Sequence, residues 1–198
     1  MNFMSAVNAD NKIIMAAQFA AAAHAGQFRR DGITPYISGH VAIVAGRAAT
    51  HSEATEDFVC AMYLHDTVED CGVKIPVINY LFGSQVGTYV AELTSYSKQI
   101  EFAMLEAGKE YIKPSRAERK EIDRLYLKNV CRLSKIGKLY DRNENLRSTL
   151  IEDADPKWAL KYVEETTALW QTALSGVDVA LETELSNYID RIRKKYSK

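Results

Sequence analysis

The chain has 198 residues, with 25 Lys and Arg against 26 Asp and Glu, and 47% of its residues are hydrophobic. This length and composition exclude a wholly disordered chain and are typical of one globular domain with a sizeable core. The formal net charge of −1 argues against a nucleic-acid binder that works through bulk electrostatics.

Targeting and membrane signals are weak. The most apolar run, residues 13–25, is interrupted by Gln18 and His24, so it is too short and too polar to span a bilayer. No charged segment with a cleavage motif precedes it, so it does not read as a signal peptide. The cysteines are odd in number and lack C-x-x-C spacing, which indicates free thiols in a reducing compartment. The sequence therefore predicts a cytoplasmic protein that does not enter a membrane.

Few Pro and Gly residues, 4 and 10, favour helices along the whole chain. In the first half, Asp10 is expected to be the N-cap of the first helix. Pro76 and Gly83 bound a short helix, because Pro is favoured in the first turn and Gly just past the last. The expected elements are, in order, helices over 10–26, 40–50, 53–65, 76–83 and about 86–93, with a loop over 29–39.

Helix signals are sharper in the second half. Residues 95–114 are ambiguous and are expected to form a lid or a partly helical loop. Ser115 and Glu118 have capping-box spacing, which predicts one long helix from there toward Asp141.

The last helices are bounded by Asp155, which is followed by Pro156 as an N-cap and first-turn pair, and by Gly176. A final helix is expected over about 177–196. No repeat and no strand-like alternation is present. The sequence thus predicts an all-α fold of about eight helices in a single domain, residues 1–198.

The first chemical cluster follows an apolar helix. His65, Asp66, Glu69 and Asp70 fall within six residues, at i,i+4 spacings that share a helix face. Three neighbouring carboxylates are costly unless a cation or a catalytic task compensates. The alternative is a solvated helix end, and this segment alone leaves the two interpretations equally open.

Two further clusters contain complementary groups. Asp141 and Asn145 are spaced i,i+4, with Lys138 one turn earlier. Arg29 and Arg30 lie in a segment rich in Gly and Pro, where guanidinium groups could clamp a phosphate. For the arginines alone, an exposed surface loop is the more common arrangement.

The clusters occur in a characteristic order along the chain. The motifs are His24-Ala25-Gly26-Gln27, Pro35-Tyr36-Ile37 with His40, His65-Asp66 with Glu69-Asp70, Phe82-Gly83, Leu93-Thr94, and Lys138-Leu139-Tyr140-Asp141-Arg142 with Asn145. This ordered set resembles the hydrolase domain of RelA/SpoT-type alarmone enzymes, in the HD metallophosphohydrolase superfamily. With no synthetase region alongside, it is most similar to the stand-alone small alarmone hydrolases. The resemblance covers about residues 10–175 and implies an HD-type helical fold.

The resemblance also implies roles for individual residues. It implies a single divalent ion, Mn²⁺, with the ligands His40, His65, Asp66 and Asp141. The catalytic acidic pair is Glu69 and Asp70. It implies substrate contacts at Arg29, Arg30, Asn145 and Tyr162, and Lys138, one turn before Asp141, is expected to join them. A mixed set of imidazoles and carboxylates is typical of sites for first-row divalent ions, and an adjacent carboxylate can orient or deprotonate a water.

Four of the positions that depart from the family pattern bear on the site. The family has its His-Pro pair one residue earlier, so Gly39 is an insertion before His40, and Val41 replaces the Pro. We expect the loop to absorb the extra residue. Glu144 and Trp158 stand where relatives have other residues that face the substrate.

The expected function is metal-dependent hydrolysis of the 3′-pyrophosphate of guanosine tetra- or pentaphosphate, which yields GDP or GTP and pyrophosphate. One alternative is a phosphatase acting on NADPH or a related nucleotide on the same scaffold. An alternative of another class is a catalytically inactive nucleotide-sensing module, favoured only by the inserted Gly39. The expected partner is a small nucleotide rather than nucleic acid, and the sequence leaves the oligomeric state open.

Overall fold

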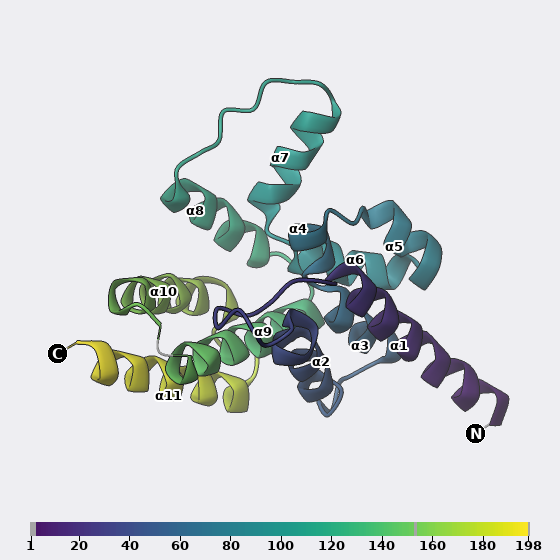
Figure 1. Cartoon of the computed structure of the whole chain (residues 1–198), viewed down its shortest axis with the longest axis horizontal. Helices are drawn as coiled ribbons and strands as arrows, with labels where there is room; N and C mark the ends of the chain where they lie inside the picture. The colour runs from purple at the N-terminus through teal and green to yellow at the C-terminus, as the bar shows by residue number, and fades with distance from the viewer. Residues whose placement is uncertain (1–2, 153, 198) are drawn as a thin grey trace. The chain divides into compact units, whose positions relative to one another are not determined.

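The structure is a computed structural model that describes residues 3–152 and 154–197, with side chains from residue 12 onward (Figure 1). Within these residues the chain forms eleven α-helices and two π-helical turns. The loop over residues 28–35 contains an isolated antiparallel β-bridge between Phe28 and Pro35, which is not part of a sheet. The all-α prediction is confirmed, with more helices than expected. The chain forms two compact units, Met1–Ala91 and Glu92–Lys198, and its description as a single domain stays a prediction.

The first unit is built on three packed helices. Both α1 and α2 lie against α3, and the fully buried Ala16 and Ala20 allow α1 to approach closely. Phe58 and Leu64 of α3 are fully buried in this core. The elements are α1 (Phe3–Ala23), η1 (Ile37–Val41), α2 (Ala42–Ala48), α3 (Glu56–Leu64), α4 (Thr67–Cys71), α5 (Ile75–Phe82) and α6 (Ser84–Leu93), which continues into the second unit.

Short-range signals set the ends of several of these helices. The Thr55 side chain accepts a hydrogen bond from the Phe58 N–H and caps α3. Gly72 ends α4 at a φ of 70°, a left-handed conformation that suits glycine. The short helix predicted between Pro76 and Gly83 is confirmed as α5.

Three predictions for this unit need correction. The first helix begins at Phe3 and runs through Asp10, so Asp10 is not its N-cap. The loop predicted over 29–39 ends early, because the π-helical turn η1 begins at Ile37. The helix predicted over 40–50 is the shorter α2, which follows directly on η1.

The second unit packs around a pair of long helices. Its elements are α7 (Tyr96–Glu106), α8 (Arg116–Leu127), α9 (Arg132–Ile151), α10 (Pro156–Leu169), η2 (Trp170–Leu174) and α11 (Val179–Tyr196). Helix α11 packs against both α9 and α10, and buries Leu185, Ile189 and Ile192. The buried Asn143 of α9 donates from Nδ2 to the Leu181 carbonyl at 3.1 Å, which joins α9 to α11.

The capping box at Ser115 and Glu118 is confirmed, but the single long helix predicted after it is wrong. The chain is helical to Leu127 and starts α9 afresh at Arg132. Cys131 is extended between the two helices and its N–H donates to a Glu92 carboxylate oxygen at 3.3 Å. This tertiary hydrogen bond favours a break between α8 and α9, although the sequence has no Pro or Gly at that point to predict one.

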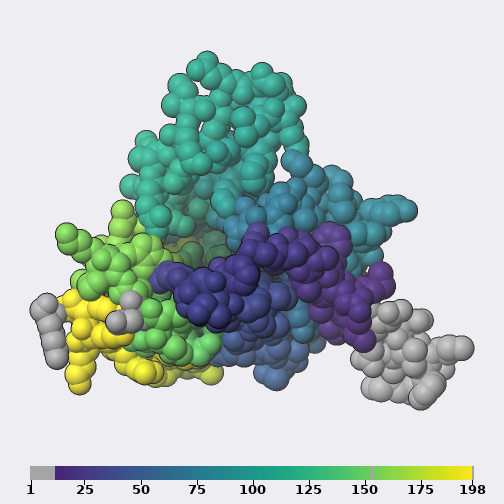
Figure 2. Space-filling view, in the orientation of Figure 1, coloured from purple at the N-terminus to yellow at the C-terminus, as the bar shows by residue number. Residues whose placement is uncertain are grey.

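The ambiguous segment over 95–114 contains a helix, α7, followed by an extended stretch. In Figure 2 the teal surface of α7, α8 and the segment that joins them is open to solvent, and most of residues 105–118 are exposed. None of the described helices combines the length and apolar character that a bilayer span requires.

Candidate metal centre

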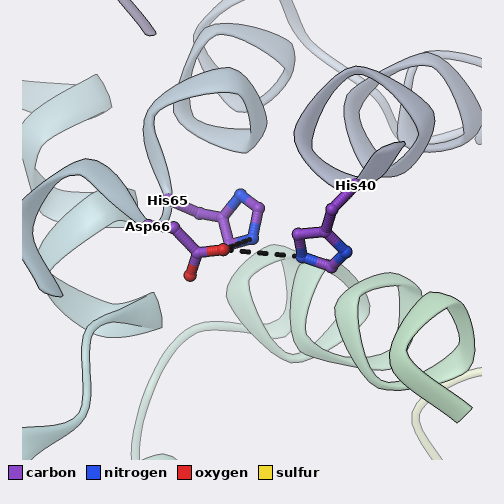
Figure 3. A group of neighbouring side chains, drawn as sticks. All are labelled: His40, His65 and Asp66. Carbon is purple, nitrogen blue, oxygen red and sulfur yellow. Dashed lines mark ion pairs between the residues drawn. The ribbon is translucent and has the colours of Figure 1, made fainter. Parts of the chain in front are cut away.

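Three side chains of the first unit converge on one point: His40, His65 and Asp66 (Figure 3). The Nε2 atom of His65 lies 3.0 Å from Asp66 Oδ2, and the Nε2 atom of His40 lies 3.5 Å from the same oxygen. Their potential ligand atoms all lie within 4.8 Å of one another. Both imidazoles are buried, so this carboxylate oxygen faces two ring nitrogens in a largely dry environment.

The backbone fixes the orientation of His65. This residue ends α3, and its Nδ1 lies 2.7 Å from the Met62 carbonyl oxygen, one turn earlier. A carbonyl only accepts, so Nδ1 carries a proton and Nε2 is the nitrogen that faces Asp66 Oδ2. A protonated Nε2 donates to that carboxylate, and a bound cation would take the place of this proton. An Nδ1–H that donates to a backbone carbonyl is the arrangement that metal-ligating histidines usually have.

His40 reaches the cluster from η1. A π-helical turn holds one more residue than an α-helical turn, and such turns are frequent at functional sites. The inserted Gly39 lies within this turn, so a helical bulge rather than a loop absorbs it. A Cβ at position 39 would lie 2.7 Å from Thr34 Cγ2 and 2.8 Å from Arg29 Cγ. Glycine is therefore required for the close approach of the loop before η1.

Tyr36 supports the cluster, and sequence reasoning did not give it a role. Its hydroxyl donates to Asp66 Oδ2 at 2.7 Å. Its ring centroid lies 5.2 Å from that of His40 and 5.1 Å from that of His24. The spacing of four residues between Tyr36 and His40 is the one signal that could have linked them.

Asp66 is held as a carboxylate. Burial alone would raise its pKa, but the neighbouring charge of His65 and the hydrogen bonds of both imidazoles hold the pKa of Asp66 well below its usual range. An ionised carboxylate is the form that binds a cation.

The proposed acidic pair lies on α4, directly after Asp66. The Asp70 N–H donates to the Asp66 carbonyl at 2.9 Å, so the helical turn expected here is present. Glu69 is partly buried and Asp70 is exposed. Gln27 donates from Nε2 to the Asp70 carbonyl at 3.2 Å and ties this turn to the end of α1. The catalytic roles of Glu69 and Asp70 stay predictions.

The two arginines have different surroundings. Asp31 organises their loop by accepting hydrogen bonds from the Ile33 and Thr34 N–H groups at 2.9 and 2.8 Å. The Arg29 guanidinium carbon lies 5.6 Å from the centroid of the Tyr36 ring, on the side chain that also bonds Asp66. Arg30 is exposed. The structure therefore brings Arg29 toward the metal cluster, and the substrate role of Arg30 stays a prediction.

In the second unit, α9 brings together the residues predicted there. Lys138 Nζ lies 2.9 Å from Asp141 Oδ2, and Asn145 donates to Asp141 Oδ1 at 2.6 Å. The i,i+4 relation of Asp141 and Asn145 is thus a direct contact. The role of Asp141 as a fourth metal ligand stays a prediction, as do the substrate contacts of Lys138 and Asn145.

Tyr162 is buried between two flat groups. The Trp158 ring stacks on it at a centroid distance of 5.0 Å and an interplanar angle of 8°, and the Arg142 guanidinium carbon lies 5.2 Å from its centroid. Burial raises the pKa of Tyr162 despite the nearby Arg142 cation. Arg142 is a residue that sequence reasoning did not single out. Glu144, expected to face substrate, is fully buried and pairs with Arg147 at 2.6 Å.

The donor set fits a divalent metal ion. Two imidazole nitrogens and one carboxylate oxygen form a borderline-hard set of the kind that first-row divalent ions take. Tyr36 and the Met62 carbonyl provide the outer hydrogen bonds that such ligands need. The histidines, Asp66 and their supports are therefore suited to hold one divalent ion.

Comparison with known proteins gives a consistent result. The model of the HD domain family matches residues 16–173. Human guanosine-3′,5′-bis(diphosphate) 3′-pyrophosphohydrolase MESH1 is 38% identical over 86 residues, 42% of this chain and 47% of that protein. The MESH1 of Xenopus tropicalis is 30% identical over 157 residues, 77% of each protein. The chain thus spans about half the length of the human relative in that alignment.

A solved structure has a similar fold. It is that of a metazoan orthologue of SpoT that hydrolyses ppGpp, and it superposes with a TM-score of 0.73. The match covers 93% of this chain and 94% of the other, at 24% sequence identity. At that identity the match establishes the fold.

Proposed function

The chain belongs to the HD domain family, and from this membership we propose that it hydrolyses the 3′-pyrophosphate of guanosine tetra- or pentaphosphate. The products are GDP or GTP and pyrophosphate. The observation that carries the proposal is the His40, His65 and Asp66 cluster, followed within one helical turn by Glu69 and Asp70. Relatives that share up to 39% identity with parts of this chain bear the name of that activity.

We propose Mn²⁺ as the ion and His40, His65 and Asp66 as the residues that hold it. Asp141 is the fourth ligand that the family resemblance predicts. A divalent ion bound there supplies Lewis acidity, which acidifies water and stabilises negative charge on a phosphoryl oxygen. The ionised Asp66 carboxylate suits this role because it needs no proton loss to bind a cation.

The protein groups have separate tasks in this proposal. Glu69 and Asp70 orient the attacking water and accept its proton, since a carboxylate is a suitable general base. Arg29 neutralises charge that builds on the phosphates, and Arg30 provides a second cation. Lys138, Asn145 and Tyr162 contact the nucleotide. Asp66 stays ionised throughout because its neighbours hold its pKa low.

Product analysis tests the proposal. Purified protein is incubated with guanosine tetraphosphate, guanosine pentaphosphate and NADPH, with and without Mn²⁺. We expect Mn²⁺-dependent release of pyrophosphate from the guanosine substrates. Orthophosphate released from NADPH alone would support the alternative phosphatase, and the absence of either product would support a nucleotide-sensing module.

The cellular setting follows from the same chemistry. The three cysteines are free thiols, one buried, one partly buried and one exposed. We propose that the protein acts in the cytoplasm on a small nucleotide, because unpaired thiols persist in reducing compartments. Fractionation of cells that express a tagged chain tests this.

A further inference from the structure

The second unit contains a cavity lined by residues of that unit. It has a volume of about 70 Å³, and its lining comes from the start of α7 and from α8, α9 and α10, which Figure 1 labels. Tyr126 forms one wall and stacks on Tyr96 at a centroid distance of 4.4 Å. A space of this size holds several water molecules and therefore a small polyatomic ion.

Four cations line this cavity: Lys120 and Arg124 of α8 and Lys138 and Arg142 of α9. Arg124 is paired with Glu121. Lys138 is paired with Asp141 at 2.9 Å. Lys120, by contrast, is partly buried and forms no hydrogen bond or ion pair with any residue in the described part of the chain. The Nε atom of Arg142 is buried and also lacks a hydrogen-bond acceptor among the described residues.

Three carboxylates also line the cavity, and two of them, Asp123 and Glu165, act on Lys120 through their charge without forming a hydrogen bond or ion pair with it. Each of the three, Glu92, Asp123 and Glu165, is engaged by another donor. Their partners are, in order, the Ser134 hydroxyl at 2.6 Å, the Ser97 N–H at 2.9 Å and the Arg116 guanidinium at 2.6 and 2.9 Å. The cavity therefore holds cationic donors with unused hydrogen-bonding capacity.

The pKa of Lys120 is lowered even though the charges of Asp123 and Glu165 oppose the shift. Burial, together with the nearby positive charges of Arg142 and Lys138, lowers the pKa of Lys120 to about 8. A buried ammonium group is unfavourable unless an anion compensates it. Guanidinium and ammonium groups that converge on one space are the usual donors for tetrahedral oxyanions.

We propose that this cavity binds an oxyanion of phosphate size, with the Lys120 ammonium and the Arg142 Nε as its donors. The ligand is either inorganic phosphate or the phosphoryl end of a larger molecule, since both present the same oxygens. The cavity shares Lys138 with the proposed nucleotide contacts, but the donors of this inference are Lys120 and Arg142, to which the proposed function assigns no role. The inference also predicts binding rather than turnover.

Binding of sulfate to the metal-free full-length protein is the direct test. NMR chemical-shift titration compares the wild type with Lys120→Met, which keeps the side-chain length and removes the charge. Loss of one charge-assisted contact should weaken binding about tenfold or more. Lys128→Met is the matched control, because Lys128 is exposed at the end of the same helix and does not line the cavity. It should bind sulfate like the wild type.

Folding of the variant is measured alongside. Lys120→Met removes a partly buried charge that forms no ion pair with a described residue, so its thermal midpoint should be no lower than that of the wild type. Lys120→Gln serves as a second charge-removing variant with the same expected loss of binding. Saturable binding that both variants retain, or no saturable wild-type binding up to about 10 mM, would overturn the proposal.

The pH dependence gives an independent readout. Sulfate stays a dianion from neutral to alkaline pH, so any change in affinity arises from the protein. The other charged groups that face Lys120 are Lys138 and Arg142 of α9, Asp123 and Arg124 of α8, Glu165 of α10 and Glu92 of α6. Lys120 loses its proton as pH rises through about 8, so wild-type affinity should fall across that range. In Lys120→Met the affinity should be low and should lack this step; a wild-type profile that is flat through pH 8 would contradict the assignment.

The source of the oxyanion is resolved by comparing ligands. Orthophosphate, pyrophosphate and GDP are titrated into metal-free Asp66→Asn protein, which excludes binding through the proposed metal. Equal affinities that Lys120→Met weakens would identify a site for the free ion, and tighter binding of pyrophosphate or GDP that Lys120→Met weakens would identify a site for a phosphoryl end. Binding of all three ligands that Lys120→Met leaves unchanged would overturn the proposal. Each of these results stands even if the chain hydrolyses no alarmone, so the two proposals fail separately.

Discussion

The Tyr36 hydroxyl holds the Asp66 carboxylate in place through one hydrogen bond. Tyr36→Phe keeps the ring beside His24 and His40 but removes the donor that lies 2.7 Å from Asp66 Oδ2. Outer hydrogen bonds of this kind typically contribute about 10- to 100-fold in metal affinity. We therefore expect weaker Mn²⁺ binding at unchanged thermal stability, measured by titrating the metal-free protein.

Tyr80→Phe is the control for Tyr36→Phe. Tyr80 is 88% exposed on α5, and the same hydroxyl is lost there without consequence for the cluster. Equal Mn²⁺ affinity in Tyr36→Phe and wild type would mean that the Tyr36 hydroxyl does not position Asp66.

In the proposed mechanism Asp66 binds the metal ion and Glu69 acts on the attacking water, so substitutions at the two positions should have different effects. Glu69→Gln should reduce kcat about 10²- to 10⁴-fold, the usual contribution of a positioned general base, and keep the metal. Asp66→Asn should lose metal and activity together. Metal analysis beside steady-state kinetics distinguishes the two variants. A Glu69→Gln protein without metal would make Glu69 a ligand, and one with wild-type turnover would remove it from the catalytic centre.

Among the elements, η1 gives the most specific test. Gly39→Ala places a Cβ within 2.8 Å of Thr34 and Arg29 side-chain atoms, and overpacking of this kind costs about 1–3 kcal/mol. Since Arg29 must move, KM should rise while the metal stays bound. Gly46→Ala in α2 is the matched control, because nothing lies within 4 Å of its added Cβ. Replacing this helical glycine should stabilise the fold by about 0.5–1 kcal/mol, as thermal unfolding would measure; a Gly39→Ala protein with unchanged stability and KM would contradict the steric argument.

Helix ends with local chemical signals were predicted correctly. The Ser115 capping box, the Asp155-Pro156 start and the Gly83 end depend on a few neighbouring residues, which the sequence displays directly. The break between Leu127 and Arg132 depends instead on Glu92, 39 positions from Cys131. A hydrogen bond over that separation leaves no local pattern, and apolar spacing simply continues across the gap.

The residues of the candidate site also differ in whether local sequence or distant contacts determine their place. His65 and Asp66 are adjacent, so their pairing is visible in the sequence. His40 depended on how one inserted residue is accommodated, and a π-helical turn resolves that question in three dimensions. Tyr36 and Arg142 were missed because their importance lies in what they touch, Asp66 and Tyr162, at distant positions of the chain.

At the scale of the whole molecule, metal binding should appear as thermal stability. A ligand that binds only the folded state stabilises it by about 2.7 kcal/mol at 100 times its dissociation constant. For a chain of this length that corresponds to a rise in Tm of about 5–10 °C. We expect Mn²⁺ to raise the Tm of metal-free wild type, and a chelator to reverse the rise and abolish turnover.

Two variants make this thermal test specific. Asp66→Asn should show no metal-dependent rise, and Asp141→Asn should show a reduced one if Asp141 is the fourth ligand. A full rise in Asp141→Asn would leave Asp141 with its contacts to Lys138 and Asn145 as its sole assigned role.

The break between α8 and α9 also exposes a cysteine that a thiol reagent can modify. Cys131, at that break, is the exposed thiol of the chain, whereas Cys60 is buried. Burial raises the pKa of Cys60 to about 11 and also raises the pKa of the partly buried Cys71, so both remain protonated at neutral pH. A maleimide dye at pH 7 should therefore attach at a single position without any engineered cysteine. Because the Cys131 N–H bonds Glu92, which lines the cationic cavity, the dye would place a fluorescent reporter beside that cavity in the unmodified sequence.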